Sequence, residues 1–167
     1  PSKCHLFQKR VKFLGSVVSE KGIEPDPDKV RAVAEWPIPK NLTELRAFVA
    51  LASYYRRHIL HFADIARPLH ALTKKGEAFR WGKQQNEAFE TLKDKLITAP
   101  ILATPLQDGE YILDTDASDG ALGAVLQQRQ HGEIKVIAYA SRVLSPSEQS
   151  YCTTRKELLA VIFGLKI

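Results

Sequence analysis

The stretch YILDTDASDGALGAVL, residues 111–126, predicts the β-hairpin around which the rest of the chain is organised. Its first half alternates between two sets of side chains, which is the period of a strand with one face toward a core. This alternation puts Asp114 and Asp116 on the same face. Residues 118–120, Ser-Asp-Gly, have the composition of a turn, and residues 122–128 return as a second apolar strand.

Two aspartates on one face of a strand admit two interpretations. Like charges this close repel each other, so they lower stability unless a cation or hydrogen-bond donors offset them. The other interpretation is an edge strand whose aspartates simply face water. The spacing alone favours this second interpretation.

The composition is typical of a soluble globular protein with one core or two small ones: 167 residues, 44% hydrophobic and 26% charged. No apolar run approaches the roughly 20 residues of a membrane span, and the opening PSKCHLFQKR lacks the apolar core of a signal peptide. We therefore expect an intracellular protein with no membrane partner. Cys4 and Cys152 match no metal-ligand spacing, which predicts reduced, structural thiols.

The net charge of +5 is unevenly distributed. Residues 1–75 carry 14 Lys and Arg against 7 Asp and Glu, whereas residues 76–167 carry 10 against 12. A basic first half suits a phosphate backbone, and an acidic second half suits a divalent metal. Charge alone favours the simpler explanation, a solvated surface.

The first half predicts a strand pair followed by helices. Residues 11–19 are expected to form the strand pair, with its turn at residues 20–22. Asp26-Pro27 predicts a helix start, because Asp caps free amide groups and Pro fits the first helical position. Asn41 with Glu44 predicts a capping box for a second, longer helix.

The end of this second helix carries an aromatic ring and cations, Tyr54, Arg56 and Arg57. Such a cluster can stack on sugars or bind phosphates, but cations at a helix end also complement the helix dipole. Helical spacing resumes at residues 62–72, where Pro68 is expected to start a new short helix.

The second half predicts one amphipathic helix, a sheet and a final helix. Residues 83–98 form the amphipathic helix, residues 101–105 an extended connector, and residues 134–139 a third strand after the hairpin. Residues 145–146 open an irregular polar stretch. Residues 154–165 are apolar all round, which indicates a buried helix.

Glu157 lies in this last helix and shares a face with Ala160, Val161 and Gly164. A charge on a face suited to tight packing needs a partner. The spacing Thr154-x-x-Glu157 also fits a capping box, in which the Glu bonds a backbone amide at the helix start. From spacing alone, the cap is favoured over a ligand role.

Eight blocks of sequence occur in the order seen in gypsy-class LTR retrotransposon and retrovirus-like polyproteins: FLGSVVSEKGI, PDPDKVRAVAEWPIP, ELRAFVALASYYRRHI, FADIARPLHALT, AFETLK, TDAS, GAVL and IAYASRVLS. The chain thus resembles the pol region from the end of the reverse transcriptase palm into ribonuclease H. The resemblance implies four parts: residues 1–24, end of the palm; 25–75, thumb; 76–106, linker; and 107–167, the first part of ribonuclease H. The fold expected is α+β, with a hairpin, a helical bundle, and three antiparallel strands plus one helix.

The resemblance implies contact with a template–primer duplex or an RNA·DNA hybrid. Phe13, Leu14 and Gly15 match the primer-grip hairpin, and Tyr54, Arg56 and Arg57 fall in the thumb. Ser16 stands where family members often carry His, so no side-chain role is carried over to it. The residues of the hairpin equally fit a plain core strand.

The resemblance also implies a two-metal site. TDAS and ELLAV place the family's first-strand Asp and first-helix Glu on Asp116 and Glu157, two of four carboxylates that hold two ions for hydrolysis of the RNA strand. Oxygen ligands favour Mg²⁺ or Mn²⁺. The other two carboxylates and the polymerase aspartates match no position here, so we expect a fragment that alone neither polymerises nor cleaves efficiently.

Two functional classes stay open on the sequence. The chain is either part of an enzyme, completed by the remainder of the pol polyprotein, or a domesticated or truncated module that binds nucleic acid or protein without catalysis. The resemblance implies a cytoplasmic particle or the nucleus. A homo-oligomer that covers an exposed sheet edge is a further expectation.

Overall fold

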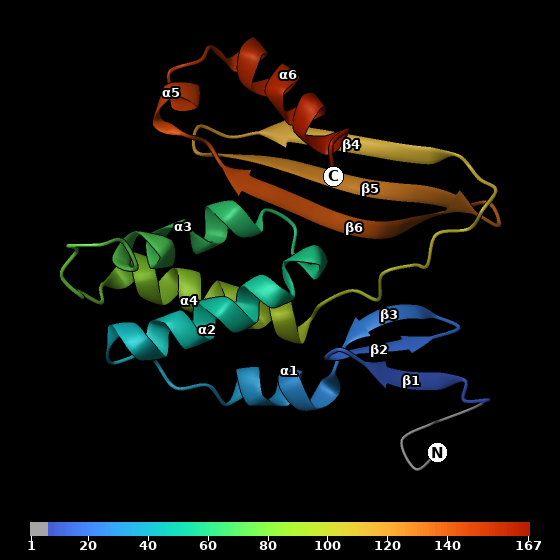
Figure 1. The fold of residues 1–167 in the computed structure, drawn as a ribbon, viewed down its shortest axis with the longest axis horizontal. Coiled ribbons are helices and arrows are strands. Elements are labelled where there is room, and N and C mark those ends of the chain that lie inside the picture. Colours follow the sequence, from blue (N-terminus) through green and yellow to red (C-terminus); the bar gives the residue numbers. More distant parts are fainter. Residues whose placement is uncertain (1–6) are drawn as a thin grey trace.

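Two antiparallel sheets of three strands each, together with a group of helices, make up the computed structural model, which describes residues 7–167 (Figure 1). The expected α+β class is confirmed. The strands of the first sheet are β1 (Arg10–Phe13), β2 (Ser16–Ser19) and β3 (Gly22–Pro25); those of the second are β4 (Tyr111–Ala117), β5 (Ala121–Gln130) and β6 (Glu133–Val143). In both sheets the spatial order follows the sequence.

The first sheet corrects the expected strand pair. Its first turn lies at Leu14 and Gly15, which have φ of 46° and 72°, and Phe13 pairs with Ser16 across it. Positive φ at both central residues belongs to the two-residue turns that match the twist of a hairpin. Leu in such a turn gives no sequence signal, so residues 11–19 were expected to turn only later. The predicted turn at residues 20–22 exists and leads into the additional strand β3.

The helical part contains α1 (Pro27–Ala34), α2 (Leu42–Tyr54), the short 3-10 helix η1 (Arg56–His58), α3 (Phe62–Leu72) and α4 (Lys83–Ile97). Both predicted helix starts are confirmed, although the Glu44 carboxylate accepts from the Lys40 amide at 2.8 Å and so does not complete the expected capping box with Asn41. The Asp26 side chain accepts from the Asp28 amide, and Asn41 Oδ1 accepts from the Glu44 amide at 2.9 Å. Each cap satisfies an amide that has no partner inside its helix.

Pro68 corrects a second expectation, because it lies inside α3 instead of starting a new helix. The buried residues of α3 form one stripe that continues past the proline: Phe62, Ala66, Leu69 and Leu72. A proline in a helix interior costs about 3 kcal/mol. Packing of this stripe into the main core offsets that cost.

The main core contains side chains from the four α-helices α1 to α4. Phe48 of α2 is fully buried and packs against Phe89 of α4, with ring centroids 4.5 Å apart, and against Trp36 at 6.0 Å. Trp81 adds an edge contact to Phe89. These large aromatic side chains hold α4 against the bundle and so fix the point from which the chain enters the second sheet.

The second sheet is covered differently on its two faces. On one face lies α6 (Thr153–Gly164), where Gly164 leaves room for Leu113 and Thr115; a Cβ on Gly164 would lie 3.1 Å from each side chain. On the other face lies the start of α3, where Ser141 Oγ accepts from the Ala63 amide at 2.9 Å. The strand β6 is longer at both ends than the expected residues 134–139.

The carboxyl-terminal helices depart from two expectations. The irregular stretch contains a short helix, α5 (Pro146–Gln149), capped by Ser145 and Glu148. Cys152, not Thr154, stands at the N-cap of α6, so Thr154 lies within the helix and the expected Thr154–Glu157 capping box is wrong. The helix begins two residues earlier than its Thr suggests.

The expected burial of α6 on all sides is also wrong. Only Lys156 and Ala160 are buried in it, while several apolar side chains are exposed: Leu158, Val161, Ile162 and, just beyond it, Leu165. Hydrophobic periodicity reports what a helix could bury, whereas burial depends on which elements cover it. Within residues 7–167, only the sheet side of α6 is covered.

A backbone bridge ties the connector to the first sheet. Ile23 and Leu102 exchange both of their hydrogen bonds, at 2.7 and 2.8 Å. Gly22 has φ of 126°, and a Cβ there would lie 2.1 Å from the Leu102 carbonyl oxygen. The bridge therefore requires glycine at this position.

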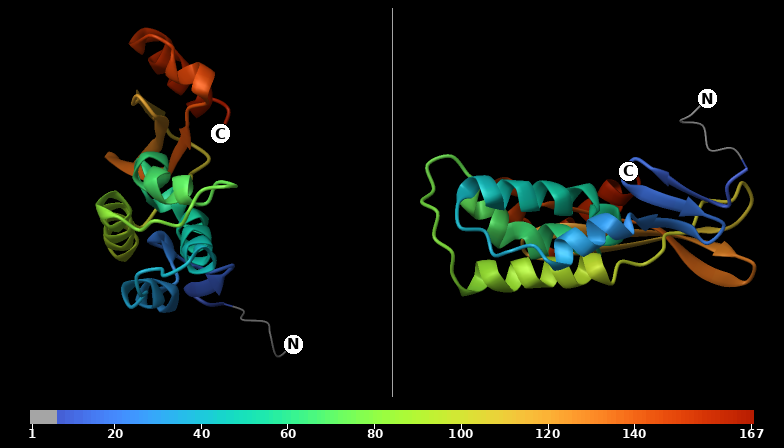
Figure 2. Two further views of the ribbon diagram at one scale, coloured as in Figure 1. Left: turned by 90° about the vertical axis from the view of Figure 1, so that its left-hand side faces the viewer. Right: turned by 90° about the horizontal axis from the view of Figure 1, so that it is seen from below.

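Seen from the side, α6 and α1 lie at opposite ends, with α3 and the second sheet between them (Figure 2). No helix within residues 7–167 is long and apolar enough to cross a membrane.

Candidate functional site

The turn between β1 and β2 projects exposed side chains next to the end of α2. Phe13 is 63% exposed and Leu14 is 73% exposed. The Tyr54 hydroxyl donates to the Leu14 carbonyl, and the Tyr55 hydroxyl donates to the Gly15 carbonyl at 2.6 Å. The structure thus brings together residues 13–15 and Tyr54, two sets that the sequence places 40 positions apart.

The two tyrosines have different environments. Tyr54 is 55% exposed, whereas Tyr55 is only 3% exposed, and burial raises the pKa of the Tyr55 phenol above its usual value. A Cβ on Gly15 would lie 3.3 Å from the ring of Tyr54 and 3.3 Å from the hydroxyl of Tyr55. The hydrogen bond of Tyr55 to the turn has no signal in the sequence, because it joins residues 40 positions apart.

Arg56 and Arg57 follow directly in η1, and both are exposed. In the described part of the chain, no Asp or Glu side chain forms an ion pair with either of them. Two guanidinium groups without carboxylate partners are available for phosphate oxygens. They also lie just past the carboxyl end of α2, so the helix-dipole explanation remains compatible with their position.

Asp116 lies near the end of β4, is exposed, and pairs in register with Gly123. Alternation puts it on the same face as Asp114, which accepts a hydrogen bond from the Gln127 side chain. This face borders a cavity of about 220 Å³ that is also lined by His61. Sequence reasoning missed His61, because only the docking of α3 on the sheet brings it there.

Glu157 lies just past the first turn of α6 and is half-buried. Its neighbour Lys156 has a side chain only 10% exposed and pairs with Asp119 in the β4–β5 turn at 2.9 Å. This hydrogen bond lowers the pKa of the Asp119 carboxyl. The Lys156–Asp119 pair, also missed from the sequence, fixes the start of α6 against the hairpin that carries Asp116.

The two candidate metal ligands are on neighbouring elements. The side chains of β4 that face α6 are Leu113 and Thr115, so alternation directs the Asp116 side chain to the other face of the sheet. Carboxylate oxygens suit Mg²⁺ or Mn²⁺, but residues 7–167 contain no group of three or more His, Cys, Asp or Glu side chains placed to hold a metal ion. A shared ion stays a prediction.

Cys152 is an exposed free thiol at the start of α6, which argues against the structural role expected for it. Cys4 lies outside the described residues.

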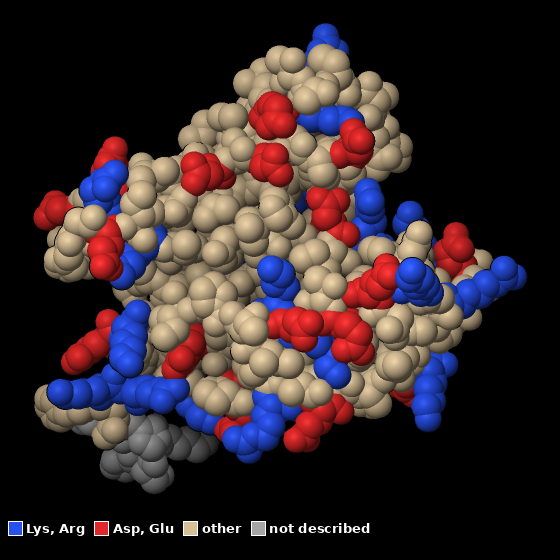
Figure 3. All heavy atoms as spheres, turned by 180° about the vertical axis from the view of Figure 1, so that it is seen from behind, with Lys and Arg blue, Asp and Glu red and all other residues tan. Residues whose placement is uncertain are grey.

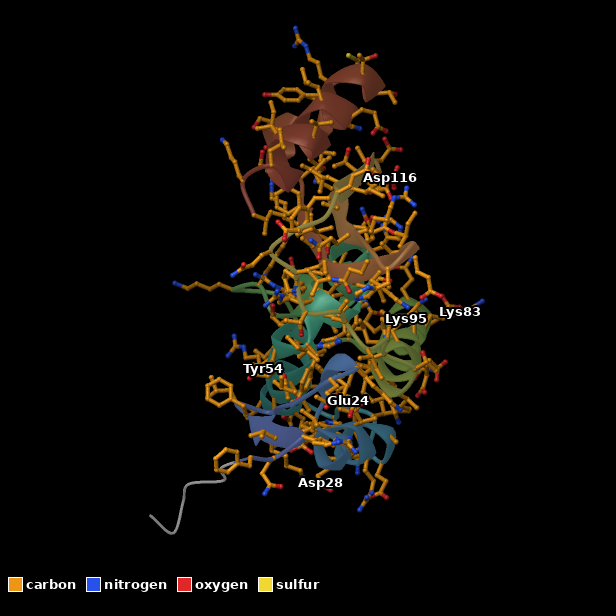
Figure 4. All side chains as sticks on the ribbon, turned by 90° about the vertical axis from the view of Figure 1, so that its right-hand side faces the viewer. Glu24, Asp28, Tyr54, Lys83, Lys95 and Asp116 are labelled. Atoms are coloured by element: carbon orange, nitrogen blue, oxygen red, sulfur yellow. The ribbon has the colours of Figure 1, made fainter. Side chains whose placement is uncertain are left out.

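The candidate metal ligand and the candidate nucleic-acid residues lie apart. In Figure 4, Tyr54 lies on one side of the molecule and Asp116 on the other, near α6. Figure 3 shows Lys and Arg side chains gathered beside the amino-terminal strands and several Asp and Glu side chains around the second sheet and α6. On the face that Figure 3 shows, the charge asymmetry of the sequence is thus also visible in space.

Residues 81–167 match the family model described as the RNase H-like domain found in reverse transcriptase. Among curated proteins, the chain is 42% identical to the retrovirus-related Pol polyprotein from transposon 297 of Drosophila melanogaster, over 98% of this chain and 15% of that protein. It is 40% identical to the corresponding polyprotein from transposon 412 of the same organism, over 99% of this chain and 13% of that protein. The Tf2-3 polyprotein of Schizosaccharomyces pombe is 37% identical, over 99% of this chain and 12% of that protein.

Among solved structures, the fold is similar to the foamy viral protease-reverse transcriptase. The complex of that protein with dsDNA superposes with a TM-score of 0.84 over 99% of this chain and 35% of that chain, at 23% identity. The complex with an RNA/DNA hybrid gives 0.83 over 99% of this chain and 22% of that chain, also at 23% identity. Likeness at this identity shows the fold.

Proposed function

Because this chain belongs to the RNase H-like family of reverse transcriptases, and its relatives are Pol polyproteins of LTR retrotransposons, we propose that it holds a template–primer duplex or an RNA·DNA hybrid. In this proposal it acts as part of a reverse transcriptase with ribonuclease H activity. One observation carries the proposal: the exposed turn at residues 13–15 is hydrogen-bonded to Tyr54 and Tyr55, directly beside the exposed Arg56 and Arg57.

This surface suits the backbone of a duplex. Phe13, Leu14 and Tyr54 offer apolar and aromatic contact for sugars, and the two arginines offer charge for phosphates. Binding of this kind depends on salt and not on base sequence. The helices α1 to α3 would serve as the thumb that presents these groups.

The metal-dependent step belongs to the same proposal. Asp116 and Glu157 would each supply carboxylate oxygens to Mg²⁺ or Mn²⁺, and further carboxylates would come from the remainder of the pol polyprotein. A metal ion held by these residues would supply Lewis acidity at the scissile phosphate and an activated water for endonucleolytic hydrolysis of the RNA strand. The exposure of Asp116, which forms no ion pair within residues 7–167, leaves its oxygens available.

Duplex binding is tested with a labelled RNA·DNA hybrid hairpin and fluorescence anisotropy at several salt concentrations. We expect Arg57→Ala to weaken binding and to reduce the slope of log K against log salt by about 1, as for the loss of one phosphate contact. Arg80→Ala is the matched control, because Arg80 is exposed and lies before α4, away from the turn. Equal effects of the two substitutions would contradict the proposed surface.

The non-catalytic module remains a second candidate, favoured by the absence of a three-ligand group within residues 7–167. Titration with Mn²⁺, followed by electron paramagnetic resonance, separates the two. The enzyme-part proposal expects Asp116→Asn to weaken Mn²⁺ binding, whereas Asp108→Asn, at an exposed loop position, leaves it unchanged. Mn²⁺ binding that is indifferent to Asp116 would favour the module.

We also propose that the exposed apolar side chains of α6 take part in self-association in an intracellular setting, either a cytoplasmic particle or the nucleus. Leu158, Val161 and Ile162 are exposed at positions i, i+3 and i+4 of α6, which lie on one face of the helix. Burial of such apolar side chains is favourable. Analytical ultracentrifugation should show a concentration-dependent dimer that Leu158→Lys abolishes. A monomer at all concentrations would remove this part of the proposal.

A further inference from the structure

A groove of about 1060 Å³ separates the end of the helical bundle from α6. One wall is formed by the end of α2 and by η1, and the other by the carboxyl-terminal end of α6, which Figure 1 shows in front of the second sheet. Strands β4, β5 and β6 supply the floor. The groove is thus distinct from the exposed turn at residues 13–15 and from the face that carries Asp116.

The charged side chains that line the groove all have one sign. Three arginines line it, Arg56, Arg57 and Arg142, and no Asp or Glu does. Arg142 is already held by Glu148 through two hydrogen bonds of 2.8 Å. Arg56 and Arg57 form no such pair in the described chain. The groove therefore has two guanidinium groups available, and these favour a negatively charged ligand.

The floor and ends of the groove are apolar and aromatic. Leu113 and Leu126 pair across β4 and β5 on the face toward α6, and small side chains such as Ala138 keep that face flat. Tyr54 and Tyr111 are 55% and 50% exposed and stand at its rim. An occupant must therefore carry flat apolar surfaces as well as negative charges.

We propose that this groove binds a single-stranded segment of RNA or DNA, with phosphates on Arg56 and Arg57 and bases against Tyr54, Tyr111 and the apolar floor. A cationic groove with aromatic platforms is the arrangement that binds single strands without sequence preference. A duplex does not fit these contacts, because its base faces are stacked inside it. The inference rests in part on the proposed function, since Tyr54, Arg56 and Arg57 would serve both surfaces.

The test uses the 167-residue chain, a labelled dT12 oligonucleotide and a labelled RNA·DNA hybrid hairpin, with fluorescence anisotropy. Tyr111→Ala should weaken dT12 binding roughly tenfold, the loss expected for one stacked base, and should leave hybrid binding unchanged. Tyr111→Phe keeps the ring and should retain dT12 binding. Tyr151→Ala is the control, because this exposed ring lies before α6 and outside the groove.

A substitution in the turn separates this inference from the proposed function. Phe13→Ala should weaken hybrid binding and leave dT12 binding unchanged. If Tyr111→Ala has no more effect on dT12 than Tyr151→Ala, or if the chain binds the hybrid but not dT12, the groove inference is overturned and the proposed function stands. If dT12 binds through Tyr111 while the hybrid does not bind, the inference stands and the proposed duplex grip fails. Displacement of dT12 by a poly-glutamate peptide at lower concentration than by unlabelled dT12 would assign the groove to an acidic protein and also overturn the inference.

Discussion

At the scale of single residues, the structure depends on positions where a side chain has no room. Gly22 is the clearest, because the Leu102 carbonyl occupies the place of its Cβ. Gly15 is similar but milder, since the Tyr54 ring and the Tyr55 hydroxyl both lie 3.3 Å from its Cβ position. Both glycines connect the first sheet to other parts of the chain.

Gly22→Ala is expected to lower the free energy of unfolding by roughly 3 kcal/mol or more, because the added methyl group breaks the Ile23–Leu102 bridge as well as straining the backbone. Gly132→Ala is the matched control, since Gly132 also has positive φ, 86°, but has no atom within 4 Å of its Cβ position. It should cost only the backbone term of about 1 to 2 kcal/mol. Urea denaturation of both variants checks this, and equal losses would contradict the role of the bridge.

The lowered pKa of the Glu148 carboxyl is expected to make the stability of the fold depend on pH. Its hydrogen bonds with Arg142 and the Ser145 amide lower its pKa to about 2, below the ordinary 4.5. A carboxyl with a lowered pKa in the folded state stabilises the fold above its unfolded pKa, and this contribution is lost as the pH falls from about 4.5 toward 2. Glu148→Gln should therefore lower the melting temperature at pH 7 and flatten its decline in that interval.

Glu90→Gln makes the same change at an exposed position that forms no ion pair with any described residue, and it serves as the control. A parallel decline in melting temperature with pH for wild type and Glu148→Gln would contradict the assignment to Glu148.

At this scale the sequence predicts local features well. The caps by Asp26 and Asn41 could be predicted because each involves residues two or three positions apart. The Tyr55 hydrogen bond to Gly15 could not be predicted, since it joins residues 40 positions apart and depends on the final packing.

At the scale of elements, α6 is held to the sheet by a packed face and one charged pair. Gly164 and Ala160 allow close approach to β4 and β5, and Lys156 reaches Asp119 at the hairpin turn. A mostly buried ammonium group lowers stability unless it is paired. The position of Glu157 therefore depends on a contact made by its neighbour.

Asp119→Ala should destabilise the attachment of α6, because it leaves the Lys156 ammonium buried without a carboxylate. Lys156→Met keeps the apolar stem and removes the charge, so it should be nearly neutral and should suppress the effect of Asp119→Ala in the double variant. Hydrogen exchange of the α6 amides is the measurement. Faster exchange in Asp119→Ala that Lys156→Met fails to reverse would show that the pair does not hold the helix.

The existence and type of the long elements could be predicted from periodicity, as for α2, α4 and the β4–β5 hairpin. Periodicity failed where another effect decided. Core packing carried α3 through Pro68, and the Thr154–Glu157 spacing suggested a cap at a position already inside α6. The exposure of the outer side of α6 depends on whether another element covers it, and a local sequence pattern does not contain that information.

At the scale of the whole molecule, α3 joins the helical bundle to the second sheet. Ser118 Oγ in the β4–β5 turn donates to Asp64 at 2.8 Å, and the Ala63 amide donates to Ser141. These contacts fix the face that carries Asp116 relative to the bundle. The expected α+β class and the order of the elements are confirmed, but this docking had no sequence signal because its partners are 54 and 78 positions apart.

A double-mutant cycle with Asp64→Ala and Ser118→Ala should give a coupling energy of about 1 kcal/mol, the net value of one such hydrogen bond. The cycle is needed because Ser118 also accepts from the Gly120 and Ala121 amides, so its single substitution removes more than this contact. Chemical denaturation of the four proteins provides the numbers. Strictly additive effects would mean that the bundle and the sheet are joined by other contacts.

The Ile23–Leu102 bridge has a consequence for biosynthesis. A ribosome releases the amino-terminal strands long before it releases the connector that pairs with them. Until the connector emerges, the outer edge of β3 lacks the partner that it has in the described fold. The helices between β3 and the connector can already form from local contacts. The two hydrogen bonds between Ile23 and Leu102 can therefore form only after residue 102 has left the ribosome. Before that point, the nascent chain can contain the helices, but the edge of β3 is still unpaired.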